Sequence, residues 1–388
     1  MTFTAAGWWR EADELDDAQQ RVVGLPRDGK YLITGKPGSG KTNLLVLRAA
    51  YLIRSDYPDI KVLTWTRLIN EFIASGVENH GLETDRELQT FKSWAEYALN
   101  DIGINIVLSG NFSDQIQQLT NALVAARCHL MRYDGILIDE AQDYTPQLLE
   151  LFNELTDRLF LSGDDNQRLY DSVGALEAAE RLVDEVIILP FHYRNGRKIC
   201  LVAEAIKGED DYTATSRYDE KKLPSQVKLE RCKDFANQIS ELKVNLIDQL
   251  RSYPNELLGV MVPRNDDLAG VVEALRASDE IEPYCQFQSR AEGNTALEVD
   301  KPIIVSTINA AKGVEYRAAH IVAMEGIGTF PPSKHRNLAY TAVTRAKTTL
   351  RGYYTESIPS WLLSAFLRGQ NTPNPAPTLA DLLPRRTG

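Results

Sequence analysis

The chain has 388 residues, of which 43% are hydrophobic and 25% charged, a composition typical of a soluble globular protein with room for two domains. A formal net charge of -11 excludes a surface that is basic throughout, so nucleic acid would need a local stripe of Lys and Arg. No apolar run approaches the length of a membrane span, and residues 1–10 lack the pattern of a secretory signal. We therefore expect a cytoplasmic protein with no membrane partner.

The cysteines are far apart in the sequence, at Cys128, Cys200, Cys232 and Cys285. No CxxC pair predicts a zinc site, and no spacing predicts a disulfide framework. Ordinary, partly buried thiols are the expectation.

Short β-rich runs alternate with helical or polar sequence along the first half of the chain. The runs lie at residues 30–34, 60–64, 135–138, 158–161 and 185–189, and a helical apolar pattern covers 43–54. Such alternation predicts a parallel sheet covered by helices on both faces.

The same pattern then repeats, with strands expected at residues 257–262, 303–307 and 319–323 and a helix at 266–277. A second α/β unit is expected to begin near Val186. The predicted division is a first unit over 1–185, a second over 186–365, and a Pro-rich tail over 366–388. The charged segment 209–224 is expected to be a surface loop or an insertion.

A glycine-rich loop separates the first predicted strand from the first long helix. Glycines allow backbone N–H groups to converge on phosphate oxygens, and the helix directs its positive end at them. Lys41 would reach the β- and γ-phosphates, and the Thr42 hydroxyl would hold Mg²⁺. The pattern predicts an ATP site formed by Gly35, Pro37, Gly38, Ser39, Gly40, Lys41 and Thr42.

A cluster of carboxylates follows the apolar run 135–138. Asp139 should therefore lie at the carboxyl end of a parallel strand, where open α/β sheets bind their ligands. Asp139 would hold Mg²⁺, and Glu140 is the natural base for an attacking water. The alternative, a solvated acidic turn, is disfavoured by the buried strand before it.

These motifs and several others resemble superfamily 1 helicases of the UvrD/Rep type. Residues 15–19 resemble the motif whose glutamine, here Gln19, reads adenine. Residues 63–66 and 90–93 resemble two motifs that contact single-stranded DNA, and residues 161–170 resemble a γ-phosphate sensor. By resemblance Gln167 would sense the γ-phosphate, and the strand would be contacted by Thr64, Trp65, Thr90, Phe91 and Tyr170. For Trp65 and Phe91, packing in the core is the alternative.

The second unit carries further family motifs. The resemblance implies that Tyr193 stacks on adenine, that Arg194 and Arg345 are arginine fingers, and that Gly313 and Glu315 lie near the ribose or phosphates. Asn309 would contact DNA. The implied fold is α/β, two tandem RecA-like domains with ATP in the cleft between them. The implied catalytic residues are Lys41, Asp139, Glu140, Gln167, Arg194 and Arg345.

The chain also departs from the family. Lys92 and Asn309 stand where histidine is usual, and residues 171–173 lack the usual aromatic and arginine. The first insertion domain of the family is reduced to a small helical insertion at about 95–133. The second is effectively absent, because few residues separate Phe287 from Ile303.

The resemblance implies an ATP-dependent translocase or helicase that moves 3′ to 5′ on single-stranded DNA, with a duplex junction as a further substrate. The alternative is an ATPase switch or motor subunit of a larger nuclease, defence or repair complex, with a protein partner that supplies the nuclease or engages duplex. The first predicts stimulation by single-stranded DNA, and the second predicts stimulation by a partner. A P-loop kinase or transporter ATPase is disfavoured, because neither combines the motifs of Gln142, Gln167 and Arg345.

Overall fold

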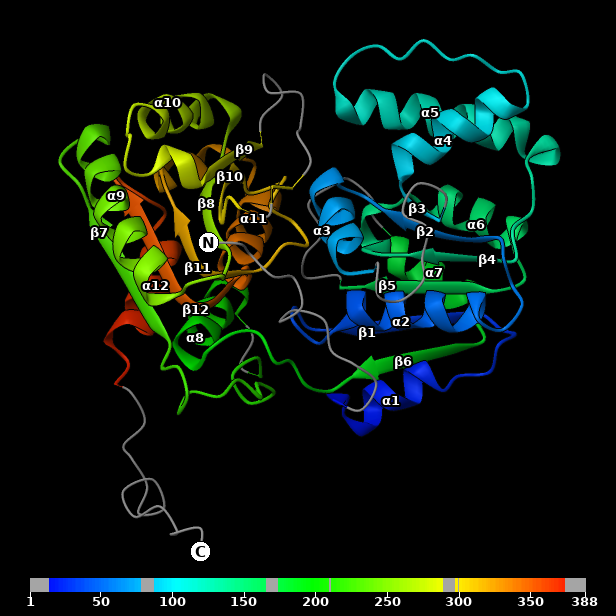
Figure 1. Ribbon diagram of the computed structural model, residues 1–388, viewed down its shortest axis with the longest axis horizontal. Coiled ribbons are helices and arrows are strands. Elements are labelled where there is room, and N and C mark those ends of the chain that lie inside the picture. The colour runs from blue at the N-terminus through cyan, green and yellow to red at the C-terminus, as the bar shows by residue number, and fades with distance from the viewer. Residues whose placement is uncertain are drawn as a thin grey trace, which may run out of the picture.

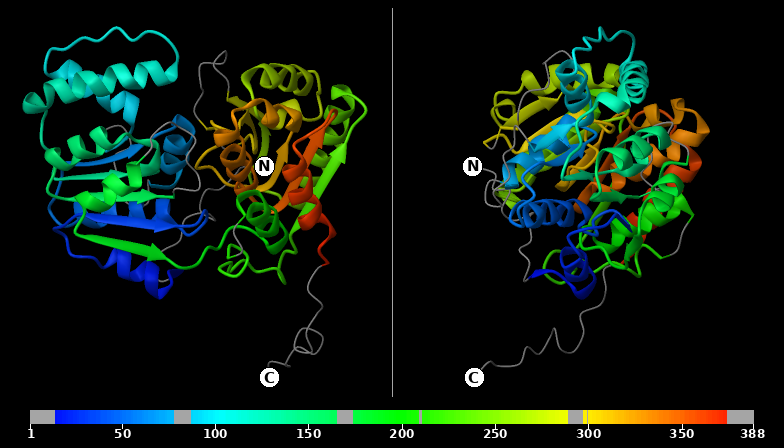
Figure 2. Two further views of the ribbon diagram at one scale, coloured as in Figure 1. Left: turned by 180° about the vertical axis from the view of Figure 1, so that it is seen from behind. Right: turned by 90° about the vertical axis from the view of Figure 1, so that its right-hand side faces the viewer.

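The computed structural model describes residues 14–77, 87–164, 174–208, 211–288, 297–298 and 300–373. It shows two α/β lobes side by side, each a sheet flanked by helices (Figure 1). The same division is seen from behind (Figure 2).

In the described part of the first unit, six strands form a wholly parallel sheet in the order β3-β2-β4-β5-β1-β6. The central strands are buried and rich in Leu and Ile, as expected for a sheet covered on both faces. The strands are β1 Tyr31–Gly35, β2 Ile60–Thr64, β3 Leu88–Thr90, β4 Gly135–Ile138, β5 Leu159–Gly163 and β6 Glu185–Leu189.

Several helices of this unit begin where the sequence supplies a capping side chain. Asp16 and Gln19 form a capping box at the start of α1, and Thr145 with Pro146 starts α6. The helices are α1 Asp17–Val23, α2 Lys41–Ile53, α3 Arg67–Val77, α4 Phe91–Asp101, α5 Phe112–Ala126, α6 Pro146–Leu155 and α7 Ala175–Leu182. Helices α4 and α5, with the 3₁₀ turn Arg127–His129, occupy the segment predicted as a small helical insertion.

The second unit also has a parallel sheet, in the order β7-β12-β11-β8-β10-β9 among its described strands. Its strands are β7 Gln226–Arg231, β8 Leu258–Val262, β9 Cys285–Gln288, β10 Ile303–Thr307, β11 Tyr316–Ile321 and β12 Ala346–Tyr354. Its helices are α8 Arg197–Lys207, α9 Phe235–Ser252, α10 Asn265–Arg276, α11 Pro332–Thr344 and α12 Ser360–Asn371.

Two predicted boundaries were wrong. The run 185–189 is the edge strand β6 of the first sheet and pairs with β1, with Tyr31 opposite Glu185, so the first unit extends to Leu189. The tail was predicted from 366, but α12 continues to Asn371 and Phe366 is fully buried. The Pro-rich residues 374–388 lie outside the described residues.

The segment predicted as a surface loop is anchored to the first unit. Tyr212 is only 2% exposed, and its hydroxyl donates to the backbone oxygen of Pro37 at 3.0 Å. The same hydroxyl lies 2.6 Å from Asn195 Oδ1, and the ring stacks on His192. A part of this charged segment therefore reaches the glycine loop instead of lying free on the surface.

One apolar cluster contains buried side chains of both units, among them Leu44 and Ile69 from the first and Ala311 and Val314 from the second. At Gly313 the backbone has φ of +88°, and a Cβ there would lie 2.8 Å from Ile69. Glycine therefore permits the close approach of the two units at this point.

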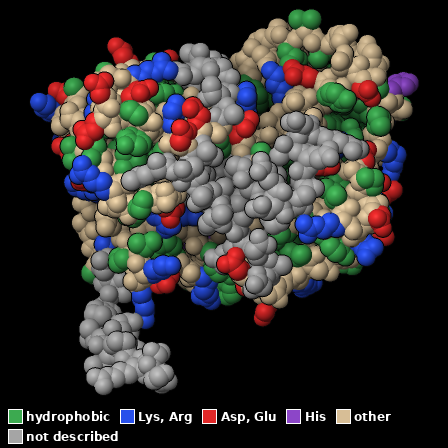
Figure 3. All heavy atoms as spheres, viewed as in Figure 1, with side chains coloured by type: hydrophobic (Ala, Val, Ile, Leu, Met, Phe, Trp, Pro, Cys, Tyr) green, Lys and Arg blue, Asp and Glu red, His purple; other side chains and the backbone are tan. Residues whose placement is uncertain are grey.

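On the face shown in Figure 3, acidic and basic side chains of the described residues are interspersed over both lobes, and no broad basic area is visible. No helix in the described part of the chain is long and apolar enough to cross a membrane.

Candidate nucleotide site between the two units

The glycine loop connects β1 to α2 at the carboxyl edge of the first sheet. Gly38 and Gly40 have φ of +80° and +91°, values that glycine adopts without strain, and Gly40 is the N-cap of α2. The Lys41 ammonium donates to the backbone oxygens of Gly35 at 2.6 Å and Lys36 at 3.2 Å. Burial lowers the pKa of Lys41, and nearby carboxylates oppose that shift.

Asp139, directly after β4, connects the start of α2 to β5. Its Oδ2 accepts from the Thr42 hydroxyl at 2.9 Å, and its Oδ1 accepts from the Ser162 hydroxyl at 2.6 Å. Burial and the adjacent Glu140 raise the pKa of Asp139, against the effect of these two hydrogen bonds. A carboxylate and a hydroxyl held together beside a phosphate-binding loop fit the oxygen ligands that Mg²⁺ takes.

Gln142 connects Glu140 to the end of β5. Its amide nitrogen donates to Glu140 Oε2, and its amide oxygen accepts from the Asp164 backbone N–H at 2.9 Å. Glu140 itself has a left-handed backbone, with φ of 56°, a conformation that costs energy in a residue other than glycine. The predicted sensor residues Gln167 and Tyr170 lie just beyond, outside the described residues.

The two predicted arginine fingers lie at the boundary between the units. Arg194 Nε donates to Glu315 Oε1 at 2.5 Å, and a Cβ on Gly38 would lie 2.4 Å from the Arg194 Cβ. Arg345 is 1% exposed and donates to the Thr341 backbone oxygen at 3.2 Å. Burial and the charge of Arg194 lower the pKa of Arg345 to about 10, whereas Glu140 acts in the opposite direction.

Glu315 is paired with cations of its own unit, namely Arg194 and, at 3.3 Å, Lys347. Burial alone would raise the pKa of Glu315, but these cations outweigh it and lower the pKa to about 2. The structure thus brings Glu315 beside Arg194 at the glycine loop. Gly313, predicted near the nucleotide, faces Ile69 instead.

Lys312 of the second unit is buried and pairs with carboxylates of the first unit. The sequence analysis did not predict it as a site residue. Lys312 Nζ lies 2.6 Å from Asp143 Oδ2 and 3.7 Å from Glu140 Oε2. Burial raises the pKa of Glu140, but Lys312, then Lys41 and Arg345, lower it by more. The sequence shows only a lysine in one motif and an additional acidic residue in another, and it does not show that the two meet.

The residues predicted on the adenine side lie together. Gln19 is buried, and its amide donates to the Ser39 backbone oxygen at 2.9 Å. The Tyr193 backbone N–H donates to Gly38 O at 3.0 Å, and its hydroxyl donates to the Asp16 carboxylate. The first helix, the glycine loop and the start of the second unit are therefore joined directly.

Three residues predicted to contact a DNA strand belong to the core instead. Trp65 is 7% exposed and lies parallel to Phe91 with ring centroids 5.8 Å apart, and Tyr144 makes T-shaped contacts with both rings, at 4.8 Å and 5.7 Å. Phe91 and Thr64 are also buried. These side chains fill the space between β2, α4 and the acidic turn, so both rings are packed in the core.

Of the other predicted strand contacts, those within the described residues, Thr90 and Asn309, are partly exposed. Thr90 caps α4, where its hydroxyl accepts from the Ser93 N–H at 3.2 Å. Lys92 donates to Gln115 at 2.8 Å. Asn309 is partly exposed on the loop after β10, close in sequence to Lys312.

Two family models match the chain, one in each unit. Residues 19–173 match an AAA domain, and residues 302–351 match the UvrD-like helicase C-terminal domain. No curated protein matches in a sequence comparison. Among solved structures, the C-terminal domain of a possible DNA helicase from Lactobacillus plantarum WCFS1 is 17% identical, covering 44% of this chain and 91% of that one with a TM-score of 0.31.

The first match covers the glycine loop and the acidic motif, and the second covers Lys312, Glu315 and Arg345. Both lie on parallel α/β units that meet at these motifs. In its two family matches the chain is similar to UvrD-like superfamily 1 helicases, and the matches lie on two RecA-like α/β units. The matched domains imply nucleotide binding, typically with Mg²⁺, and binding of nucleic acid.

Proposed function

We propose that this protein is a single-stranded-DNA-dependent ATPase that moves along the strand 3′ to 5′. The observation that carries the proposal is the meeting of charged groups from both units around one glycine loop. Lys41, Asp139 and Glu140 come from the first unit, and Arg194 and Arg345 come from the second. A site divided in this way works only when the two units are together.

In this proposal the glycine loop and Lys41 hold the phosphates of ATP. Glu140 takes a proton from a water molecule whose oxygen attacks the γ-phosphorus, and the bond to the β,γ-bridging oxygen breaks to release ADP. Arg194 and Arg345 neutralise the charge that develops on the transferred group. Mg²⁺, held by Thr42 and Asp139, would supply further positive charge to the phosphates.

ATP contacts both units only in the closed state, so binding favours closure and hydrolysis releases it. Gln142 supports a link from this cycle to the strand, because it joins Glu140 to the end of β5, where the proposed sensor segment begins. Among the described residues, Thr90 and Asn309 are the proposed strand contacts that are partly exposed. The direction of movement rests on the family resemblance.

The test is steady-state ATPase activity without nucleic acid and with single-stranded DNA, single-stranded RNA or duplex DNA. We expect the largest stimulation with single-stranded DNA, and loss of turnover in Glu140→Gln with ATP and DNA binding retained. A translocation assay with the two strand polarities then tests direction. Near-normal hydrolysis in Glu140→Gln would exclude this site as the catalytic centre.

A second candidate function is an ATPase switch in a larger complex. The observation in its favour is the small size of the α4–α5 insertion, where relatives of this family carry a larger domain. Strong stimulation by a protein partner, with no effect of single-stranded DNA, would select this candidate.

A further inference from the structure

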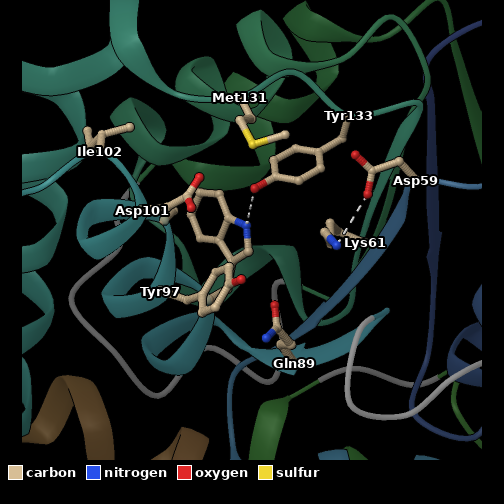
Figure 4. Close-up of a pocket in the computed structure, with 10 residues that line it drawn as sticks. Asp59, Lys61, Gln89, Tyr97, Asp101, Ile102, Met131 and Tyr133 are labelled. Atoms are coloured by element: carbon tan, nitrogen blue, oxygen red, sulfur yellow. Dashed lines mark hydrogen bonds and ion pairs between the residues drawn. The ribbon is translucent and has the colours of Figure 1, made fainter.

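A pocket of about 440 Å³ lies on the first unit, outside the nucleotide site. Its walls come from α4, from the start of β2, from the segment before β4, and from β3 at the edge of the sheet. In Figure 4, Asp101 and Tyr97 lie on one side of the pocket, the Asp59–Lys61 pair lies on the other, and the Tyr133 ring lies between them. This volume is within the range of about 300–1,000 Å³ typical of ligand sites.

The floor of the pocket is rigid and aromatic. Trp94 is 1% exposed, and its indole N–H donates to the Tyr133 hydroxyl at 3.1 Å. Lys61 lies 3.3 Å from Asp59, and its ammonium lies 5.3 Å from the centre of the Tyr133 ring. The aromatic surfaces are therefore held in place before any ligand arrives, which reduces the entropy cost of binding.

The charges of the pocket favour a cation. Two carboxylates, Asp59 and Asp101, face one ammonium, Lys61, which leaves an excess of one negative charge. Lys61 is already paired with Asp59, whereas Asp101 is exposed beside the aromatic rings. Carboxylates repel phosphate, so this chemistry disfavours a nucleic-acid strand. Aromatic faces with a carboxylate are the groups that bind guanidinium.

The rim indicates that this cation belongs to a protein. Tyr97 is 66% and Met131 is 58% exposed, and the exposed Ile104 and Val107 follow on the same insertion. Exposed apolar side chains such as Tyr97 and Met131, which both line this pocket, typically mark a protein contact. A small free cation would leave them uncovered, whereas a peptide segment with an arginine flanked by apolar residues would cover them.

We propose that the pocket beside α4 receives an arginine side chain of a partner protein, whose apolar neighbours pack on Tyr97 and Met131. The contact is independent of the nucleotide site and of the activity proposed above. It assigns to the small insertion a binding role of its own.

The test follows the indole N–H resonance of Trp94 in the full ¹⁵N-tryptophan-labelled protein, assigned with Trp94→Phe. The probes are acetyl-Leu-Arg-Leu-amide and the same peptide with citrulline, which keeps the shape and removes the charge. We expect a saturable shift with the arginine peptide only. Asp101→Asn should weaken binding by about fivefold, the effect of an ion pair of about 1 kcal/mol.

Tyr97→Ala should weaken binding as well, whereas Glu150→Gln, which removes an exposed carboxylate on α6, should not change it. Equal binding of the citrulline peptide, or no saturable shift, would overturn the proposal. The proposal would also be overturned if a dT12 oligonucleotide shifted the resonance and the shift grew in Asp101→Asn, because that result would identify a nucleic-acid site. A shift that depends only on protein concentration would instead assign the pocket to a second copy of the chain.

Discussion

Replacing Lys312 with methionine tests the ion pair that Lys312 of the second unit forms with Asp143 of the first. Lys312 and Asp143 are both buried, with 2.6 Å between their charged atoms, and Glu140 lies 3.7 Å away. With an effective dielectric constant of about 20, Coulomb's law gives about 6 kcal/mol for the nearer pair and about 4 kcal/mol for the farther. The desolvation of each buried ion costs several kcal/mol and cancels much of this attraction.

The substitution therefore matters mainly because it leaves Asp143 and Glu140 buried without their cation. The expected loss is about 3–5 kcal/mol of unfolding free energy. Urea denaturation followed by circular dichroism measures it, with Lys233→Met, an exposed lysine on the second unit, as the control. In Lys312→Met/Asp143→Leu the loss should be smaller than the sum of the single losses, because both members of the buried pair are gone.

Lys312→Met should also raise the pKa of Glu140, since Lys312 is the strongest of the cations that lower it. If Glu140 is the catalytic base, the acidic limb of the ATPase pH profile should move to higher pH. A Lys312→Met protein within about 1 kcal/mol of the wild type would refute the reasoning, because breaking a buried ion pair costs more than that.

Three further substitutions test residues at the boundary between the units. Arg345→Ala should lower ATP turnover by about 10³-fold or more, with nucleotide affinity measured by a fluorescent ATP analogue nearly unchanged; unchanged turnover would remove Arg345 from the site. Tyr212→Phe, which loses the hydroxyl bonds to Pro37 and Asn195, should cost about 1–3 kcal/mol of stability, and an unaltered urea midpoint would contradict this anchor. Glu315 has a pKa of about 2 against an ordinary 4.5, so its ion pairs stabilise the fold above pH 4.5 by on the order of 3 kcal/mol. This contribution should disappear as the pH falls from 4.5 toward 2, and a stability difference from Glu315→Gln that stays constant over that range would refute it.

Much of the fold was predictable because the buried parallel strands are short apolar runs. The strands that the sequence did not predict are not simple buried apolar runs. β3, β7 and β9 lie at the edges of the sheets, and β12 contains the polar run Lys347 to Thr349 beside Arg351. β6 was recognised but assigned to the wrong unit, since an apolar run carries no information about which sheet it joins.

The candidate site was predictable as far as motifs and strand ends define it. Thr42, Asp139 and the glycine loop meet as expected because the carboxyl ends of parallel strands share one edge of the sheet. Burial was less predictable. An aromatic residue after a strand, such as Trp65, is equally suited to stacking on a base or packing in a core. The contact between Lys312 and Asp143 depends on how the two units meet, and no pattern within either unit contains that information.

The apolar cluster shared by the two units has a consequence for unfolding. Because Ile69 of the first unit packs where Ala311, Gly313 and Val314 of the second approach it, separating the units would expose apolar surface in each. Calorimetry should therefore record one cooperative thermal transition for the two units in place of two, and residues 14–189 expressed alone should melt at a lower temperature than the whole chain. Although the chain forms two separate sheets, we expect the two units to unfold together on heating.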